Sequence, residues 1–546
     1  MAKTPAPDTS EWDLPRLRAS FSMQDDWKNP VDDQAAQEFF DVKFYPYNPI
    51  DVSAVFAACS KKHVVVCRLH EKEKDKNPCE IIQVIRDDDG ETTANCTCTW
   101  TKNPENNRPW LCIAGTDAKV KVYDIVDGTK VTTLVGHGGG INDLTTSPAN
   151  PWIIASASDD TTVRIWSLET VHAKQPCVCI LGGEGHMWDL LSVAFHDTGR
   201  HVLSAGHDQV INLWTIPELP NEHVDSPKVV HYPHFSTTEI HNNLVDCVAF
   251  FGDLILSRAC HEDTIVLWRI EGFNSDNEPL GPLQAPTTYD PTKQTRSAFA
   301  STLPGTHPAQ FTRLLQFATP DCTSQFFMRF RMFHAPGKHP ILCFNNAKSK
   351  TLFWDMSRFS AYDRFMEELR DYAESPDPKA LPPPDKPAWL QVKKNPAPKK
   401  TTVVGTSSSL RFGSTVNGGG GGNDGGDREV STAALVSASP DPDSVAGLGG
   451  YNKRTLDEWA ELYDITNSHR PIKPHRIAAM EGTFVGRQVA WSPEGDWCVV
   501  VGNFNRVLIY QRWPKDMKKE DSRSIKDPTP AMSVAASVAA SVVEGA

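Results

Sequence analysis

Two short segments of the 546-residue chain hold residues whose types and spacing could support chemistry. His137-Gly-Gly-Gly140 resembles the oxyanion loop of some esterases, whose backbone N–H groups stabilise a developing negative charge. That reaction also needs a serine in a Gly-x-Ser-x-Gly elbow, and the chain contains no such elbow. Cys260-His-Glu-Asp263 resembles a set of metal ligands, but it coincides with the acidic turn of a repeat described below. The sequence therefore predicts no catalytic set, no metal site and no enzyme activity.

The 13 cysteines are too sparse in a chain of this length for a disulfide framework. Cys96/Cys98 and Cys177/Cys179 are spaced by two positions on predicted strands, so both sulfurs of a pair lie on one face. No matching pair of His or Cys lies at the spacing of a zinc site. Cysteines inside apolar runs, such as Cys67, are interpreted as small buried hydrophobic residues in a reducing compartment. No cofactor is expected.

Charge and composition limit the classes of partner. The net charge is −13, and a general nucleic-acid binder would normally be basic. An acidic protein suits basic partners, of which histone tails are one class. No apolar run of membrane-spanning length occurs, and Met1–Asp8 lacks the apolar core of a secretory signal. The basic segment Lys393–Lys400 could contact nucleic acid or direct nuclear import, and a solvated linker explains it equally well.

A repeated pattern runs through the middle of the chain. Its three clearest copies run from His137 to Trp166, from His186 to Trp214 and from His241 to Trp268. In each copy an acidic residue stands at the same offset before the tryptophan, and apolar residues alternate with period two. This alternation, bounded by Gly, Asp and Asn turns, predicts three or four short antiparallel strands per copy. Such a sheet cannot bury its faces alone, so the copies must stack on one another.

These features are the signature of WD-repeat propeller blades. We therefore predict an all-β fold, a seven-bladed WD-repeat β-propeller with a long, partly disordered insertion late in the chain. In WD-repeat proteins the histidine, a strand serine, the turn aspartate and the tryptophan form a buried hydrogen-bond network that is structural rather than catalytic. By this resemblance the network comprises His137, Ser156, Asp160 and Trp166 in one copy, and His186, Ser204, Asp208 and Trp214 in the next.

One strand with an aromatic or equivalent end marks each predicted blade. These strands are His63–Leu69 and those that contain Tyr123, Trp166, Trp214, Trp268, Trp354 and Tyr510. The segment Leu17–Met23 could supply the outer strand of the last blade and so close the ring between the two ends of the chain. Two helices are predicted outside the blades, Ser360–Ala373 and Thr455–Tyr463, the second with a capping box of Thr455 and Glu458.

The predicted organisation follows from these positions. The glycine and proline content between the two helices cannot support a core, which favours disorder there. The predicted parts are a tail at 1–35, part of which supplies the closing strand; propeller blades 1–6 at 36–357; an insertion at 358–470, disordered over 375–450; the last blade at 471–513; and a disordered tail at 514–546.

Several stretches go beyond the general WD pattern. They are Gly182–His186, His234–His241, Val245–Val248, Gly252–Ser257 and Phe327–Phe330. Together and in this order they resemble the EED, or extra sex combs, family, the WD-repeat subunits of Polycomb repressive complex 2. The resemblance covers about Phe39–Ser357 and Pro471–Trp513, and it indicates a fungal form with a long insertion.

The resemblance implies a binding site for trimethyl-lysine of histone H3 at one end of the central channel. Trimethyl-lysine keeps its charge but has no N–H to donate, so aromatic faces bind it through cation–π attraction. The cage positions fall on Phe40, Cys96, Phe326 and Phe327, and Cys96 stands where the family has a tyrosine. Phe326 stands where the family usually has a tryptophan, so the cage is expected to bind more weakly or to use an aromatic residue from elsewhere. The same matching places the histone peptide groove at Asn142, Asp246, Arg329 and Arg487.

The resemblance also implies the function and the partners. It predicts a nuclear, non-catalytic scaffold and methyl-lysine reader that binds the histone H3 tail and stimulates a SET-domain methyltransferase subunit of the Enhancer-of-zeste type. A zinc-finger subunit of the VEFS type is a further implied partner, and nucleic acid is expected at most through the insertion. The alternative is a generic WD-repeat protein–protein adaptor without methyl-lysine recognition.

Overall fold

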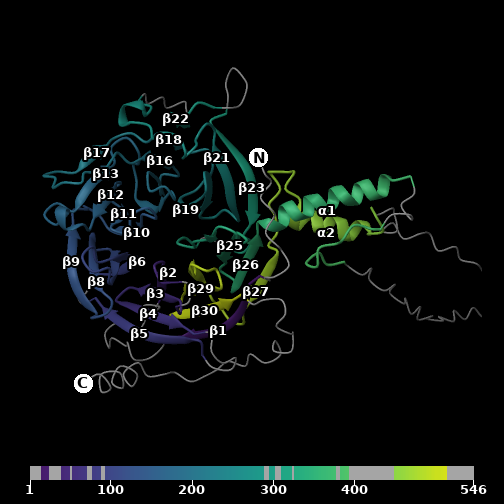
Figure 1. Ribbon diagram of the computed structural model, residues 1–546, viewed down its shortest axis with the longest axis horizontal. Helices are drawn as coiled ribbons and strands as arrows, with labels where there is room; N and C mark the ends of the chain where they lie inside the picture. Colours follow the sequence, from purple (N-terminus) through teal and green to yellow (C-terminus); the bar gives the residue numbers. More distant parts are fainter. Residues whose placement is uncertain are drawn as a thin grey trace, which may run out of the picture. The chain divides into compact units, whose positions relative to one another are not determined.

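The computed structural model describes residues 14–23, 38–49, 52–70, 77–87, 93–287, 294–301, 309–322, 325–376, 382–392 and 448–512. The chain divides into two compact units. One unit comprises residues 1–360 and 462–546, and the other comprises residues 361–461. All strands of the described residues belong to the first unit, in which seven sheets lie around a common axis (Figure 1). The predicted seven-bladed β-propeller is therefore confirmed.

Each blade begins with its innermost strand, and the strands follow outward. Blade 1 contains β2 (Phe39–Phe44), β3 (Val55–Ser60), β4 (His63–Leu69) and β5 (Cys79–Arg86). Blade 2 contains β6 (Asn95–Lys102), β7 (Pro109–Gly115), β8 (Lys119–Asp124) and β9 (Thr129–Val135). Blade 3 contains β10 (Ile141–Thr146), β11 (Ile153–Ser158), β12 (Val163–Ser167), β13 (Cys177–Leu181) and β17 (Lys228–Val230).

The remaining four blades follow the same order. Blade 4 contains β14 (Leu190–Phe195), β15 (His201–Gly206), β16 (Ile211–Thr215), β18 (Phe235–Thr237) and β22 (Thr295–Ser297). Blade 5 contains β19 (Val245–Phe251), β20 (Leu254–Ala259), β21 (Thr264–Ile270) and β23 (Phe311–Ala318). Blade 6 contains β24 (Arg331–Phe333), β25 (Ile341–Asn345), β26 (Lys350–Asp355) and β27 (Arg476–Ala479). Blade 7 contains β28 (Gly486–Trp491), β29 (Trp497–Gly502), β30 (Arg506–Gln511) and β1 (Arg16–Ser22).

The seven marker strands of the sequence all occupy the third position of a blade. They are β4, β8, β12, β16, β21, β26 and β30. Trp166, Trp214, Trp268 and Trp354 are fully buried, which is why the aromatic residue recurs at this position. A large flat side chain here packs against the sheet of the preceding blade and removes much apolar area from water.

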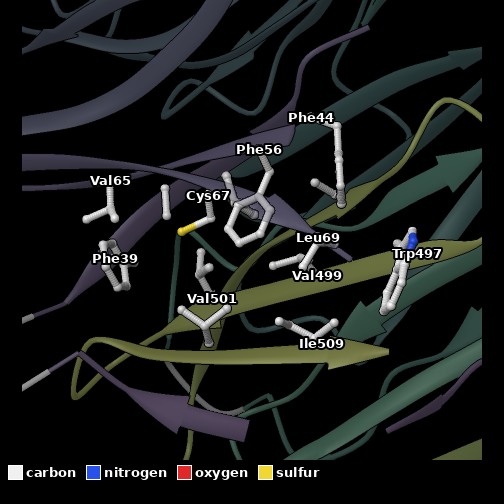
Figure 2. Close-up of a cluster of buried hydrophobic side chains, with 14 of the residues drawn as sticks. Phe39, Phe44, Phe56, Val65, Cys67, Leu69, Trp497, Val499, Val501 and Ile509 are labelled. Atoms are coloured by element: carbon white, nitrogen blue, oxygen red, sulfur yellow. The ribbon is translucent and has the colours of Figure 1, made fainter. Parts of the chain in front are cut away.

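The ring closes between the two ends of the propeller. β1 pairs antiparallel with β30, from Arg16 opposite Gln511 to Ser22 opposite Arg506. Figure 2 shows the apolar cluster between blades 7 and 1, where Val501 and Ile509 of blade 7 face Phe39 of blade 1. This cluster joins the first blade to the last, so closure rests on apolar burial as well as on strand pairing.

Two blades have more strands than the predicted three or four. In blade 3, β17 adds to β13 in parallel, and in blade 4, β22 adds to β18 antiparallel. Both additions come from connections that follow the third strand of the next blade, between β16 and β18 and between β21 and β23, where the sequence has no repeat pattern to reveal them. Two short 3-10 helices also lie in such connections, at Thr170–His172 and Pro282–Gln284.

The long insertion interrupts blade 6 rather than preceding blade 7. The predicted last blade at 471–513 is therefore wrong at its start, because β27 pairs with β26 as the outer strand of blade 6. The chain leaves the propeller after β26 and returns at Ile472, whose backbone bonds to Ala318 and Gln316 of blade 5. A four-residue outer strand carries too little pattern for the sequence to place it.

The second unit is built on two helices, α1 (Ser357–Glu374) and α2 (Lys453–Tyr463). Trp459 is buried, lies near the rings of Phe365 and Tyr451, and donates its indole N–H to Gln391 O at 2.8 Å. The predicted disorder over 375–450 is wrong for the residues around Leu390, which is buried in this unit. Residues 393–447 and the predicted tail 514–546 lie outside the described residues.

The predicted capping box of α2 is also wrong. The Asn452 side chain accepts a hydrogen bond from the Thr455 backbone N–H at 2.8 Å, so Asn452 caps the helix and Thr455 lies inside it. Within the described residues no helix is long and apolar enough to cross a membrane. All 13 cysteines are free thiols, and Cys67 is buried as predicted. No group of three or more potential metal ligands occurs in the described part of the chain.

Candidate functional site

The histidine network of the repeat is assembled in blade 3. His137 Nδ1 lies 2.8 Å from Asp160 Oδ2, and His137 Nε2 lies 2.6 Å from Ser156 Oγ. Because a carboxylate only accepts, Nδ1–H donates to Asp160 and Nε2 accepts from the serine hydroxyl. The Ser156 oxygen in turn accepts from Trp166 Nε1–H at 2.8 Å. The four residues thus form one directed chain from the indole to the carboxylate.

Blades 4 and 5 repeat this arrangement. In blade 4, Asp208, His186, Ser204 and Trp214 are joined by hydrogen bonds of 2.7–3.0 Å. In blade 5, Glu262 replaces the aspartate and bonds to His241 at 2.6 Å. The order Ser–His–Asp resembles a hydrolase triad, but the serine has no exposed surface and already accepts from tryptophan. The network therefore fastens strands and turns together.

Electrostatics keep these networks in one protonation state. Burial lowers the pKa of His137 and so favours the neutral ring that the geometry requires. Burial alone would raise the pKa of the Asp208 carboxyl, but the hydrogen bond from His186 and two backbone N–H groups outweigh it and hold that pKa below its usual value.

Blade 2 replaces the network by a buried ion cluster that the sequence did not predict. Lys121 is fully buried, and its ammonium lies 2.5 Å from Asp87 and 2.7 Å from Asp117. Asp117 occupies the acidic turn of the repeat, but blade 2 has no histidine at the position that pairs with this turn in blades 3, 4 and 5. The only sequence signal is a lysine inside an otherwise apolar strand.

Five of the eight candidate binding residues share one structural position. Six innermost strands carry a register shift at their second residue, which is the mark of a β-bulge. A bulge turns one side chain away from the regular alternation, which is common beside binding sites. The six bulge residues are Phe40, Cys96, Asn142, Leu191, Asp246 and Arg487. Five of them are predicted site residues, and Leu191 is the one that the sequence missed.

The four cage positions lie around the end of the channel where the innermost strands begin. Phe326 is 44% exposed, and its ring centroid lies 5.0 Å from that of Phe327. Arg487 links Phe326 to the start of blade 1, because it donates to Phe326 O at 2.7 Å and pairs at 2.5 Å with Glu38, two residues before Phe40.

Phe327 has a left-handed backbone, with φ of 54°. This conformation costs a non-glycine residue about 1–3 kcal/mol and persists only where surrounding contacts enforce it. One such contact is the hydrogen bond from the next backbone N–H, that of Met328, to Asp246 Oδ2 at 3.4 Å. The Phe327 ring itself lies against the Phe326 ring and the Arg329 guanidinium.

Cys96 is half-buried, and its thiol donates to Ile141 O of blade 3 at 3.0 Å. Burial raises the pKa of this thiol to about 12, so the sulfur is neutral. Cys96 therefore lies between blades 2 and 3 as a small polar-tipped side chain, where it offers no aromatic face.

Arg329 reaches from the start of blade 6 to the innermost strands of blades 3 and 4. Its guanidinium lies over the Phe327 ring at 5.3 Å and pairs with Asp143 at 3.0 Å. It also donates to Asn142 O at 3.1 Å and to Leu191 O at 2.7 Å. Since Arg329 is only 5% exposed, it ties blades 3, 4 and 6 together from inside and supports the predicted groove rather than lining its surface.

The other predicted groove residues differ in access. Asp246 is fully buried and accepts both contacts from Arg258 Nη1, at 2.7 and 2.8 Å. Asn142 is half-buried and bonds to Asp159 at 2.6 Å and to Leu190 O at 2.8 Å. Arg487 is half-buried beside Phe326. Asn142 and Arg487 are therefore the two that can reach a bound peptide.

Comparisons with known proteins agree with this architecture. The family model described as WD domain, G-beta repeat, matches residues 128–167 and 176–215. The Polycomb protein EED of Chaetomium thermophilum is 57% identical over 564 residues, which covers 94% of this chain and 98% of that protein. The Polycomb protein esc of Drosophila virilis is 32% identical over 35% of this chain and 48% of its own length.

Solved structures give the same result. A chain in the crystal structure of the Chaetomium thermophilum Polycomb repressive complex 2 is 58% identical with a TM-score of 0.79, covering 93% of this chain and 99% of its own. A chain in the structure of ctPRC2 in complex with H3K27me3 and H3K27M matches with the same identity and TM-score, over 92% and 98%. The chain therefore belongs to the EED family of Polycomb proteins, the WD-repeat, non-catalytic subunits of Polycomb repressive complex 2.

Proposed function

We propose that this subunit binds a trimethylated lysine of the histone H3 tail at the end of the channel where the innermost strands begin, and that it thereby stimulates the methyltransferase. The observation that carries this proposal is the pair of rings at Phe326 and Phe327, one exposed and the other held by a strained backbone. Backbone strain of this kind gathers at binding sites, where it fixes a side chain in advance.

The bulge residues complete the proposed cage. Phe40 supplies a third aromatic face, and Cys96 takes the fourth wall. A methylated ammonium loses little on leaving water because it has no N–H to bond, and each ring contributes about 0.5–2 kcal/mol. A complex of a close relative with H3K27me3 supports this ligand for the present chain.

The proposed partners follow from the same relationship. They are a SET-domain methyltransferase subunit of the Enhancer-of-zeste type, a zinc-finger subunit of the VEFS type and the histone H3 tail. Membership of the family supports them, as does the similarity to chains of solved PRC2 complexes. A nuclear location is part of the proposal, because chromatin is the substrate of such a complex.

The test is titration of the full chain with H3 tail peptides that are trimethylated or unmethylated at one lysine. We expect tighter binding of the trimethylated peptide. Phe326→Ala should remove most of that preference, because it removes an aromatic face that would contact the methylated ammonium. The ring is 44% exposed, so its loss should leave the fold intact. Equal binding of both peptides by the wild-type protein would leave a protein–protein adaptor as the function. A melting curve of Phe326→Ala should match that of the wild type.

A second variant tests the departure at the fourth wall. Cys96→Tyr should add an aromatic face and tighten trimethyl-peptide binding by about 0.5–1 kcal/mol, with no gain for the unmethylated peptide. Cys96→Ser is the matched control, since it keeps a small donor for Ile141 O and adds no ring. Weaker binding by Cys96→Tyr would mean that another residue already occupies this wall.

A further inference from the structure

Two large apolar side chains stand exposed at the start of blade 4. Met187 is 83% exposed and Trp188 is 65% exposed. They directly follow His186 of the buried network, in the connection that leads to the innermost strand β14. Trp188 therefore lies at the same end of the propeller as the proposed cage.

The backbone that carries them is held on both sides. The Met187 N–H donates to Asp208 at 3.0 Å, and the next carbonyl but one, that of Asp189, accepts from His207 N at 2.9 Å. A Cβ added to Gly185 would lie 2.3 Å from the Trp214 ring, so only glycine permits this close approach. The exposed side chains thus project from a fixed loop, and methionine and tryptophan are enriched at protein interfaces relative to the rest of the surface.

The equivalent positions of neighbouring blades are different. Blade 3 has Gly138-Gly139 after its network histidine, and blade 5 has Asn242-Asn243. Small or polar residues therefore satisfy the fold at this position. The Met–Trp pair of blade 4 is not required by the architecture.

Acidic side chains surround the exposed pair. Asp159 of blade 3 and Asp189 are both exposed, and Glu184 is exposed just before Gly185. Although Asp159 is exposed as a residue, partial burial of its carboxyl group raises its pKa, and the neighbouring negative charge of Asp189 adds to that rise. Among the described residues no lysine or arginine forms an ion pair with Asp159 or Asp189. The surface thus offers negative charge and an aromatic face together.

This surface is continuous with the proposed cage. Asn142, which bonds to Asp159, also bonds to Leu190 O, and Arg329 beneath Phe327 bonds to Leu191 O. Trp188 is three residues from Leu191, so their Cα atoms are at most about 11 Å apart. An extended peptide advances about 3.3 Å per residue, so roughly three residues of a bound peptide span the distance from Leu191 to Trp188.

We propose that Met187, Trp188 and Asp189, with Asp159, form a second subsite that binds a lysine or arginine of the histone tail flanking the methylated lysine. The cation lies on the indole face while the carboxylates balance its charge. This inference rests on the proposed function, because the methylated lysine is what places the flanking segment. It assigns the acidic, exposed Trp188 loop to recognition of a basic extended peptide.

The test is affinity measurement on the full chain with four peptides. Each carries one lysine, trimethylated or not, and an eight-residue flank on both sides that is either basic or has its lysines and arginines replaced by glutamine. Trp188→Ala should weaken binding of the basic-flank peptides about two- to thirty-fold and leave the neutral-flank peptides unchanged. Asp189→Asn should reduce the salt dependence of basic-flank binding.

Leu283→Ala removes an apolar side chain that is 99% exposed elsewhere and should change nothing. The subsite is overturned if Trp188→Ala binds all four peptides as the wild type does, or if it weakens basic and neutral flanks equally. Preference for the trimethylated peptide without any effect of Trp188→Ala would sink the subsite and keep the proposed function. If Trp188→Ala weakens only the basic-flank peptides while the wild type shows no preference for the trimethylated lysine, the proposed function fails and binding of a basic peptide at Trp188 remains.

Discussion

Replacement of Arg329 by methionine is expected to lower the free energy of unfolding by about 3–5 kcal/mol, because it leaves two buried carboxylates to share one ammonium. Asp143 would lose its ion pair at 3.0 Å, and the carbonyls of Asn142 and Leu191 would lose their donor. Lys43 lies 3.5 Å from Asp41 and 3.9 Å from Asp143, so these three residues and Arg329 form one group of charges, the channel cluster. The variant leaves its two carboxylates with one ammonium. Chemical denaturation at neutral pH measures the loss.

Arg487→Met is the matched control. Arg487 also touches the cage, through Phe326 O and Glu38, but it is only half-buried. The Arg487–Glu38 pair is less deeply buried than the Arg329–Asp143 pair, with side chains 16% and 13% exposed against 5% and 9%, so its loss should lower the free energy of unfolding by less. Equal stability of wild type and Arg329→Met would show that the channel cluster does not hold the blades together.

The same cluster explains why part of the site could not be predicted from the sequence. Arg329 bonds to Asp143 across 186 residues and to Leu191 across 138, so no local spacing joins them. Their side chains meet only because the propeller brings three innermost strands to one axis. The resemblance to the EED family placed Arg329 near the peptide, but it could not reveal that the side chain is buried.

The bulges show a second limit. The six bulge residues comprise one each of Phe, Cys, Asn, Leu, Asp and Arg, so no residue type marks the position. A bulge depends on the pairing of two strands, and sequence alternation does not reveal pairing. Leu191 was missed for this reason, because it lacks a polar or aromatic group that would draw attention.

The repeat itself was predictable because each network lies within one blade. His186, Ser204 and Trp214 follow one another at short intervals, and three copies repeat the order. The outer strands were not predictable in the same way. β27 has four residues and follows the insertion, so the apparent start of the last blade was assigned too early.

Replacement of Asp208 by alanine is the second change with a large expected effect. Its carboxylate accepts from His186 Nδ1–H and from the backbone N–H groups of Met187 and Val210. Removal leaves three donors without this acceptor, and we expect a loss of about 1–3 kcal/mol in the free energy of unfolding at pH 7. Asp160→Ala should cost a similar amount in blade 3, where the Asp160 carboxylate accepts from His137 Nδ1–H and from the Gly138 N–H.

The pH dependence of the stability loss distinguishes loss of the carboxylate's hydrogen bonds from a general weakening of the fold. Since the folded pKa of Asp208 is below its unfolded value, its contribution is complete above about pH 4 and is lost as pH falls through the folded pKa. The difference between wild type and Asp208→Ala should therefore shrink as pH falls below about 4. Asp208→Ala should also loosen the Trp188 loop, whereas Asp160→Ala should not. Unchanged melting of both variants would contradict a stabilising role for the networks.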